Sequence, residues 1–301
     1  MDIKGQIAVV ANQLEENYKK QGIFEIEIGQ KFPKRSEVID IINESRRIIF
    51  PGFFGTENTA YINLNHFASL VLSNVYEKLF KQIRVAFMFA KRGENLANID
   101  SEAEKIASQF IEQIPRIQNT IFKDVEAMLD GDPAAGSQED VIFSYPGIYA
   151  LFVYRLAHIL YKLNVPYIPR IMTEHAHSKT GIDINPGAQI GEYIAIDHGT
   201  GIVIGETTII GDHVKIYQGV TLGALSTMKG QALSGIKRHP TIEDYVVIYA
   251  NATILGGNTI IGKNSVIAGN TFVTESVPEN SKVSSNIPEI NLTQVCKNYK
   301  A

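Results

Sequence analysis

The sequence has only one cysteine, Cys296, among its 301 residues. A single thiol excludes an intramolecular disulfide framework and fits a reducing compartment, so we expect a cytoplasmic protein. A lone thiol can serve as a nucleophile or a redox sensor, but we interpret Cys296 as an ordinary residue.

Long apolar runs and an excess of one charge are also missing. The uncharged and mostly apolar segment VIFSYPGIYALFVY contains Pro146 and Gly147 and is too short to span a bilayer. The start of the chain lacks the apolar run of a signal peptide. The net charge is −4 and the pI is near 6.0, which gives no global field for nucleic acid or an anionic membrane. We expect neither as a partner.

Residues 1–165 have the pattern of α-helices. The segment 101–114 places apolar side chains at steps of three and four, and Ser101 with Glu104 has the spacing of a capping box. We expect this helix to end at Pro115 and a further helix to cover 116–129. Gly131 and Pro133 would end that second helix.

Two more helices are expected in this half. One covers 64–89, with a wide apolar face that includes Leu70 and Val71 and suggests burial between helices or across a subunit contact. The other follows Pro146. We therefore interpret 1–165 as a helical domain that serves oligomerisation.

From about residue 182 the period of the sequence changes to six. Aliphatic residues recur at this spacing with two slips and one interruption: Ile184, Ile190, Ile196, Ile202; Ile204, Ile210, Ile216, Leu222; Ile242, Ile248, Ile254; Ile261, Ile267, Val273. Neither a helix nor simple strand alternation gives this period, which is the signature of a parallel β-helix with aliphatic side chains pointing into a triangular prism. The predicted fold is α+β, with the helical domain followed by a β-helix over 166–280 and a tail over 281–301.

Residues 224–240, ALSTMKGQALSGIKRHP, interrupt the repeat. The segment is rich in small and polar residues, and it ends in two cationic or titratable groups, Arg238 and His239. A loop that leaves a rigid solenoid is a common place for functional groups. We favour a functional loop over a merely solvated one.

Seven histidines are candidates for chemistry. His66 and His158 lie on helical faces and are interpreted as packing residues, and His213 is at a solvent-facing repeat position. His175 and His177 form an HxH pair, which has few acidic residues near it for a metal site.

His198 is distinguished by its carboxylate neighbours. Asp183 lies fifteen positions earlier, close to one coil, and Asp197 precedes it directly. A carboxylate beside an imidazole fixes its tautomer and stabilises the imidazolium, which makes a general base. Neighbours in a strand point to opposite faces, so Asp183 is favoured as the partner of His198 over Asp197. A polar pair on the solenoid surface is the alternative at this point.

Together these segments resemble one enzyme family. DINPGAQIG, IDHGTGIVIGET, VTLGA and KRHPTI, in this order, are similar to the signature of serine O-acetyltransferases, hexapeptide acyltransferases with a left-handed β-helix. DPAA (132–135) and GIYALFVYRLAH (147–158) resemble the helical segment that leads into that domain. The resemblance covers about residues 120–276.

The resemblance implies acetyl transfer from acetyl-CoA to the hydroxyl of L-serine, giving O-acetylserine for cysteine synthesis. By this resemblance His198 is the general base and Asp183 its partner. A guanidinium suits the serine carboxylate, which favours Arg238, with His239 alongside. Asp132 and Asp197 suit the ammonium group.

The family also implies a way of binding its second substrate. Acetyl-CoA would run along the solenoid edge past small residues, here Gly223, Ala224, Ala250 and Ala268, and no metal is expected. Active sites between the subunits of a trimer, hexamers made of two trimers and inhibition by L-cysteine are further family properties.

Three features depart from the family pattern. TLGA replaces the usual TLGG, and the loop before RHP is longer than in the common enterobacterial type. Residues 277–301 lack the GVPA segment. The chain ends NYKA rather than in Ile, so the complex with O-acetylserine sulfhydrylase is not expected.

Three other functions remain open on the residues. An acyltransferase for a sugar hydroxyl would share the β-helix, acetyl-CoA and a histidine base. A zinc-dependent hydratase would use His198, His213 and His239 as ligands. A solenoid that acts only as an assembly module would not bind acetyl-CoA.

Overall fold

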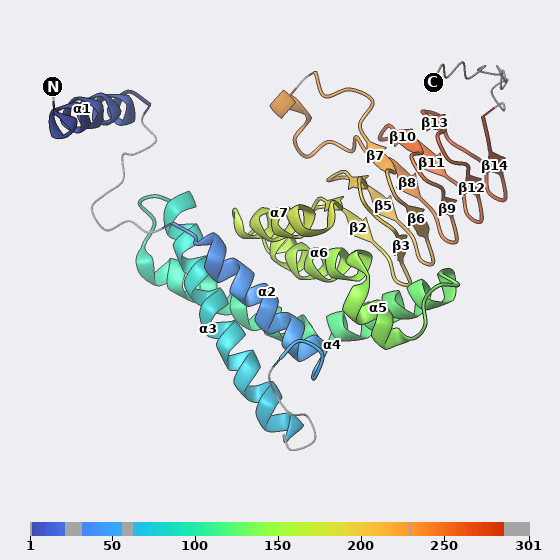
Figure 1. The fold of residues 1–301 in the computed structure, drawn as a ribbon, viewed down its shortest axis with the longest axis horizontal. Helices are drawn as coiled ribbons and strands as arrows, with labels where there is room; N and C mark the ends of the chain where they lie inside the picture. Colours follow the sequence, from blue (N-terminus) through green and yellow to red (C-terminus); the bar gives the residue numbers. More distant parts are fainter. Residues whose placement is uncertain (1, 22–31, 56–62, 229, 286–301) are drawn as a thin grey trace, which may run out of the picture.

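The computed structural model describes residues 2–21, 32–55, 63–228 and 230–285. Helices occupy the N-terminal part, and a parallel β-solenoid of short strands follows (Figure 1). Within these ranges no helix is both long and apolar enough to cross a membrane. Cys296 and the C-terminal NYKA lie outside the described residues.

The described residues form seven α-helices: α1 Ile3–Gln21, α2 Arg35–Ile49, α3 Leu64–Ala90, α4 Leu96–Gly131, α5 Gln138–Ser144, α6 Pro146–Lys162 and α7 Ile168–Thr180. The predicted helices over 64–89 and after Pro146 are confirmed as α3 and α6. On α3, Val71 is buried as expected, whereas Leu70 is 57% exposed and faces away from the core. The helical region runs to Thr180 rather than to about residue 165, because α7 packs on α6 before the first strand begins.

The prediction that a helix ends at Pro115 is wrong. Helix α4 continues through Pro115 and begins five residues before Ser101, at Leu96, where the Asn95 side chain caps it by accepting from the Ala97 N–H at 2.9 Å. An internal proline costs a helix about 3 kcal/mol. One buried stripe runs along both halves of α4, and each fully buried aliphatic side chain contributes about 1.5–3 kcal/mol. Packing of the two halves on the same core therefore outweighs the proline.

The end of α4 lies two residues beyond the predicted position 129, and its C-cap is Asp132 rather than Gly131. The helix stops at Gly131, and Asp132 takes an extended conformation with φ −121 and ψ 107. Because Pro133 follows, Asp132 is held away from the helical region of backbone conformation. This leaves the Asp132 side chain beside the solenoid.

The solenoid strands form three parallel sheets (Figure 1). Their bounds are β1 Asp183–Ile184, β2 Gln189–Ile190, β3 Ala195–Asp197, β4 Val203–Ile204, β5 Ile209–Ile210, β6 Lys215–Tyr217, β7 Thr221–Gly223, β8 Thr241–Ile242, β9 Val247–Ile248, β10 Thr253–Leu255, β11 Ile260–Ile261, β12 Val266–Ile267, β13 Phe272–Val273 and β14 Lys282–Val283. The sheet orders are β1-β4-β7-β10-β13, β11-β8-β5-β2 and β14-β12-β9-β6-β3. The chain visits the three sheets in turn, which gives a triangular prism.

The six-residue period fixes the register of these sheets. Ile184 pairs with Ile204, Ile204 with Leu222, and Leu222 with Ile254, so aliphatic residues stack on aliphatic residues along the core. All the predicted repeat positions except Ile202 lie in strands, and Ile202 is buried in a turn. The repeat prediction is confirmed.

Each corner of the prism is named here by its histidine. The His198 corner joins the β3 sheet to the β1 sheet, the His239 corner joins the β1 sheet to the β2 sheet, and the His213 corner joins the β2 sheet to the β3 sheet. Residues 224–240, which include one short 3-10 turn at Gly230–Leu233, leave the solenoid at the His239 corner.

A buried ion pair joins the helices to the solenoid. Arg155 on α6 donates to both carboxylate oxygens of Asp124 on α4, at 2.7 and 2.9 Å, and to the Gly191 carbonyl at 2.8 Å. The Ile194 N–H also donates to Asp124, at 2.9 Å. Breaking one partner of such a pair costs about 3–5 kcal/mol, since it leaves a buried charge uncompensated. The pair therefore fixes how α4, and with it Asp132, sits on the solenoid.

Candidate active site

His198 lies on the turn after β3. Its backbone φ is 58, and Gly199 and Gly201 in the same turn have φ 79 and 82. A left-handed conformation costs a residue with a Cβ about 1–2 kcal/mol. The imidazole is 71% exposed, and its Nε2 lies 3.8 Å from Asp197 Oδ1. The turn thus holds an imidazole out from the coil, where it can reach a bound molecule.

The turn of His198 stacks on the segment that precedes Asp183. The Gly201 N–H donates to the Gly181 carbonyl at 2.8 Å, and the Asp183 N–H donates to the Ile202 carbonyl at 2.9 Å. The spacing of fifteen therefore does bring Asp183 to the coil next to His198.

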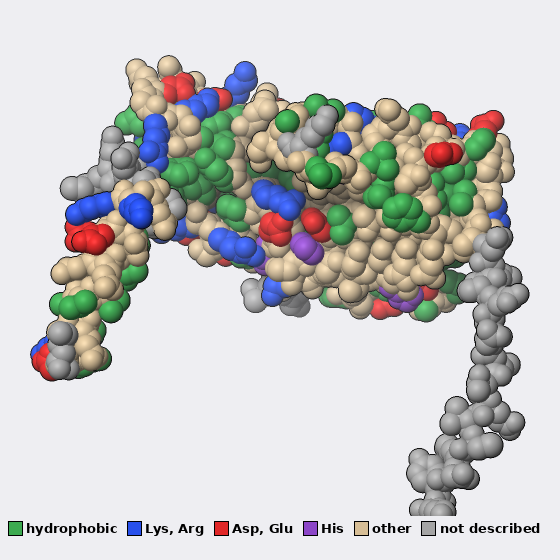
Figure 2. All heavy atoms as spheres, turned by 90° about the horizontal axis from the view of Figure 1, so that it is seen from above, with side chains coloured by type: hydrophobic (Ala, Val, Ile, Leu, Met, Phe, Trp, Pro, Cys, Tyr) green, Lys and Arg blue, Asp and Glu red, His purple; other side chains and the backbone are tan. Residues whose placement is uncertain are grey.

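The Asp183 side chain points to another group of residues. It lies 3.8 Å from Arg170 and shares a cluster with Glu174 and His177 of α7. In the described part of the chain, no hydrogen bond or ion pair joins Asp183 to His198. Charged and histidine side chains gather on the molecular surface near the junction of helices and solenoid (Figure 2).

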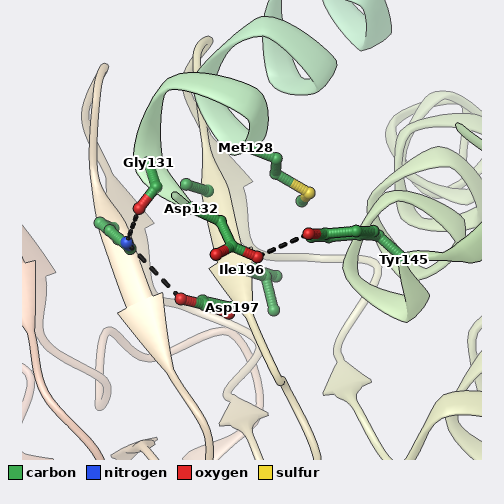
Figure 3. Close-up of a pocket in the computed structure, with 8 residues that line it drawn as sticks. Met128, Gly131, Asp132, Tyr145, Ile196 and Asp197 are labelled. Carbon is green, nitrogen blue, oxygen red and sulfur yellow. Dashed lines mark hydrogen bonds and ion pairs between the residues drawn. The ribbon is translucent and has the colours of Figure 1, made fainter. Parts of the chain in front are cut away.

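A small pocket lies where the end of α4 meets β3 and β6 (Figure 3). Asp132 Oδ2 accepts from the Tyr145 hydroxyl at 2.5 Å. Asp197 Oδ2 lies 3.6 Å from Lys215 Nζ, which also donates to the Gly131 carbonyl. Apolar residues complete the lining: Met128, Ala195 and Ile196. The pocket therefore joins one carboxylate from the helices to one from the solenoid.

Hydrogen bonds hold Asp132 in its charged form. The Tyr145 hydroxyl lowers the pKa of Asp132, and the Ala134 N–H, at 2.8 Å, acts in the same direction. The same bond raises the pKa of Tyr145 to about 12. At neutral pH Asp132 is ionised and Tyr145 is protonated, so the pocket offers negative charge to a cation.

Arg238 is held at the end of the 224–240 loop. Its Nη2 donates to Glu206 at 2.5 Å and its Nη1 to the Leu233 carbonyl at 3.1 Å. The Tyr161 hydroxyl donates to the other Glu206 oxygen at 2.9 Å. Burial raises the pKa of Glu206, but the bonds from Arg238 and Tyr161 outweigh burial, and this pKa lies below its usual value. The guanidinium is therefore fixed against an ionised carboxylate.

His239 is buried beside Arg238. Its Nδ1 accepts from the Thr207 N–H at 3.1 Å, and its ring fills the space that a side chain at Gly205 would occupy. Burial, with the charges of Arg238 and Lys237, lowers the pKa of His239 to about 4. The ring is neutral, and because Nδ1 accepts, Nε2 carries the proton.

The small residues predicted to contact CoA lie at two different corners of the prism. Gly223 ends β7, and Ala224 lines a groove with Arg238 at the His239 corner. Ala250 and Ala268 line another groove at the His198 corner. One chain does not bring all four into one groove.

The other predicted residues divide in the same way. The His198 corner carries Asp132, Asp183, Asp197 and His198, whereas the His239 corner carries Arg238 and His239. The β1 sheet separates these two corners. A single chain therefore holds the predicted residues in two separate groups, named here the two half-sites.

Four residues of these half-sites were missed from the sequence. Lys215 and Tyr145 hold the carboxylates of the pocket, and Glu206 and Thr207 hold Arg238 and His239. Glu206 and Thr207 follow Ile204-Gly205 in the sequence, where two polar residues after a repeat glycine were the available signal. Lys215 and Tyr145 gave no comparable signal.

The remaining histidines do not form a common site. On α7, His175 is buried whereas His177 lies 3.4 Å from Glu174, so the HxH pair does not converge. His198, His213 and His239 are at three different corners, and one chain cannot gather them around one zinc ion.

The chain has close relatives of one kind, although no protein-family model matches it. A plasmid serine acetyltransferase of Synechococcus elongatus is 43% identical over 260 residues, which cover 84% of this chain and 81% of the relative. The crystal structure of Entamoeba histolytica serine acetyltransferase 1 in complex with L-cysteine has a TM-score of 0.72 at 38% identity, covering 81% of this chain and 86% of that one. A serine acetyltransferase in complex with CoA has a TM-score of 0.53 at 27% identity, covering 81% and 95%.

Proposed function

This chain belongs to the serine acetyltransferase family, and on that premise we propose how its own residues carry the acetyl group from acetyl-CoA to the hydroxyl of L-serine. The observation that carries the proposal is the pocket in which Asp132 and Asp197 lie beside the exposed His198. A cation site next to a free imidazole fits an acceptor that has an ammonium group close to a hydroxyl.

His198 acts as the general base. A serine hydroxyl is too weakly acidic to attack unaided, so the imidazole takes its proton as the oxygen attacks the thioester carbonyl. The tetrahedral intermediate expels the CoA thiolate, which receives that proton from the imidazolium. The products are O-acetylserine and CoA, and no acyl-enzyme forms.

Asp183 serves as the carboxylate partner of His198. The stacking of the His198 turn on residues 181–183 supports this pairing, which requires the imidazole to turn away from Asp197 and the Asp183 side chain to turn away from Arg170. If Asp183 is the partner, Asp183→Asn lowers kcat, whereas Asp197→Asn mainly raises KM for serine. The reverse pattern would assign the partner role to Asp197.

Serine is bound at both of its charges. Asp132 and Asp197 take the ammonium group. Arg238 takes the carboxylate, since a guanidinium binds it in a fork, and the Nε2 proton of His239 is available beside it. CoA runs past the small residues named above, where the absence of side-chain bulk lets a pantetheine chain approach the backbone.

The two half-sites meet between copies of the chain. In a ring of three prisms, the His198 corner of one copy faces the His239 corner of the next, which brings all the predicted residues together. The sheet that separates the corners within one chain supports this trimer. Two such trimers would form a hexamer through the helical region, and L-cysteine, bound by the Entamoeba relative, would compete with serine.

Mixing two defective variants tests the shared site. His198→Ala chains and Arg238→Ala chains are unfolded together, refolded at equal amounts and assayed at low serine. A site between copies regains function in about a quarter of positions, because each variant supplies what the other lacks. Separately refolded chains, mixed afterwards, are the control. Activity no higher than that control would place both residues of a site in one chain.

The acceptor itself is tested by release of free thiol from acetyl-CoA with a panel of hydroxyl compounds. L-serine should give far more CoA than water, sugars or amino sugars. Release with a sugar but not with serine would replace this function by the alternative acyltransferase.

A further inference from the structure

Lys215 joins three parts of the pocket. It is the first residue of β6, and its side chain is only 18% exposed. Its Nζ donates to the Gly131 carbonyl at the end of α4, lies 3.6 Å from Asp197 Oδ2, and lies 4.7 Å from the centre of the Tyr217 ring. Figure 3 draws the contacts with Gly131 and Asp197 as dashed lines. One ammonium group thus ties the helical region to the solenoid.

A comparison with Lys263, another lysine of the solenoid, shows which contact of Lys215 is unusual. Lys263 at the His213 corner lies 3.8 Å from Asp244 and 5.4 Å from the Tyr245 ring, so it has the same kinds of partner. Its side chain is 47% exposed, and it contacts no helix among the described residues. An exposed pair of this kind contributes little to stability. The contact of Lys215 with the end of α4 is what Lys263 lacks.

The contact with Gly131 holds the chain directly before Asp132, in addition to the Asp124–Arg155 pair farther along α4. Asp132 follows Gly131 directly, and the carbonyls at a helix C-terminus carry partial negative charge that favours a cation. Lys215 therefore fixes the chain immediately before one carboxylate while it faces the other, Asp197. Removing this lysine would free the end of α4 to move relative to β3.

The charges of the pocket match one further cation. Asp132 and Asp197 bring two negative charges, and Lys215 supplies one positive charge. One negative charge is left, which a single ammonium group neutralises. A half-buried lysine that faces Asp197 leaves room for one amino group rather than two.

We propose that Lys215 is a positioning residue for the amino group of the acceptor amino acid, holding Asp132 and Asp197 at the separation that one ammonium group bridges. This inference rests on the proposed function of the two carboxylates. Lys215 does not touch the hydroxyl or the thioester, so its effect falls on binding of the acceptor.

The test compares Lys215→Met, Lys215→Arg and, as the matched control, Lys263→Met in the full chain. Initial rates over serine and acetyl-CoA concentrations give both KM values and kcat, and calorimetric titration with L-serine gives Kd. Lys215→Met should raise KM and Kd for serine roughly tenfold or more, the size expected when a hydrogen bond from a charged group is lost. The KM for acetyl-CoA and kcat should change about twofold or less, and Lys215→Arg should restore most of the serine affinity.

Two results would overturn the inference. One is a serine KM in Lys215→Met equal to that of Lys263→Met. The other is an equal loss for both substrates that follows a lower melting temperature, which indicates a merely structural role. The variants Asp132→Asn and Asp197→Asn distinguish a failure of the Lys215 inference from a failure of the proposed function. If they too leave serine binding unchanged, the ammonium site itself is misplaced; if they weaken it while Lys215→Met does not, only the role of Lys215 fails.

Discussion

His198 and His213 stand at two corners of the same solenoid with nearly the same backbone, φ 58 and 57. The His213 ring is stacked between Tyr193 and Tyr245, with centroids 4.4 and 4.6 Å away. His198 has no stacked ring beside it in the described structure and is 71% exposed. Residue type and backbone conformation are the same, so the neighbours alone decide which imidazole is free to react.

The histidine at the third corner, His239, has a different environment from the other two. His239 is 8% exposed, its Nδ1 is occupied by the Thr207 N–H, and its ring packs against Gly205. The three corners therefore hold one histidine that is free, one that is stacked and one that is buried. Each environment predicts a different response to mutation or to pH.

The largest effect is expected for the free histidine. His198→Ala should lower kcat by roughly 10²–10⁴-fold, the usual contribution of a general base. His213→Ala, the matched change at the stacked corner, should leave kcat within about twofold, because its ring lies away from both half-sites. Steady-state kinetics at saturating serine and acetyl-CoA measure both. A comparable loss of kcat in His198→Ala and His213→Ala would show that the exposed imidazole is no more important for turnover than the stacked one.

The buried histidine should make stability depend on pH. The folded pKa of His239 is about 4, against about 6.5 when unfolded, so the unfolded chain binds the proton more readily. The stability that the neutral, buried ring of His239 contributes is complete above about pH 6.5 and is lost as the pH falls toward 4. The loss in the free energy of unfolding is about 2 kcal/mol at pH 5.

Urea unfolding at pH 7.5 and pH 5, at fixed protein concentration, measures this loss for the wild type and for His239→Gln. The variant should lose less stability than the wild type over this interval. His158 and His175, whose pKa values burial also lowers, act in the same direction and are present in both proteins. An equal loss in the two proteins would mean that His239 is not buried in its neutral form.

The other residue of the His239 corner should affect substrate binding. Arg238→Ala should raise KM for serine by roughly 10–100-fold, since it removes charged hydrogen bonds to the carboxylate. The KM for acetyl-CoA should stay close to its wild-type value. Initial-rate kinetics with each substrate varied in turn give both constants. A rise confined to acetyl-CoA would assign Arg238 to the cofactor instead.

The stacked histidine should give the smallest effect. His213→Ala should lower the free energy of unfolding by about 1–2 kcal/mol, because two ring contacts are lost. His213→Phe keeps a ring in the stack and should recover most of this stability. Thermal or urea unfolding of the three proteins measures the difference. No loss in His213→Ala would show that the stack contributes little and that the turn alone sets this corner.

The solenoid was predictable because its geometry acts directly on the sequence. A side of the prism needs one inward aliphatic residue, and the stacking of Ile184 on Ile204 and of Ile204 on Leu222 leaves that requirement visible as a period. The helix boundaries were less accurate. Pro115 predicts a break from local conformation, and only the packing of both halves of α4 on one core overrides it.

The half-sites were predictable to a different degree. His198 and Arg238 stood out by residue type and by resemblance to a family. Lys215 could not be identified, because its role depends on the contact between β6 and the end of α4, 84 residues away in the chain. Glu206 is similar, since its contact with Arg238 spans the whole 224–240 loop.

The turn that carries His198 lies outside the strands that set the register of the solenoid. Residue 184 pairs with 204, whereas 204 pairs with 222, so the first coil is two residues longer than the second. The extra length lies in the left-handed turn that carries the imidazole. A two-residue deletion there would shorten the coil to the length of its neighbour and leave the strand register intact. The scaffold can therefore gain or lose this exposed imidazole by a small insertion or deletion, without redesign of the core.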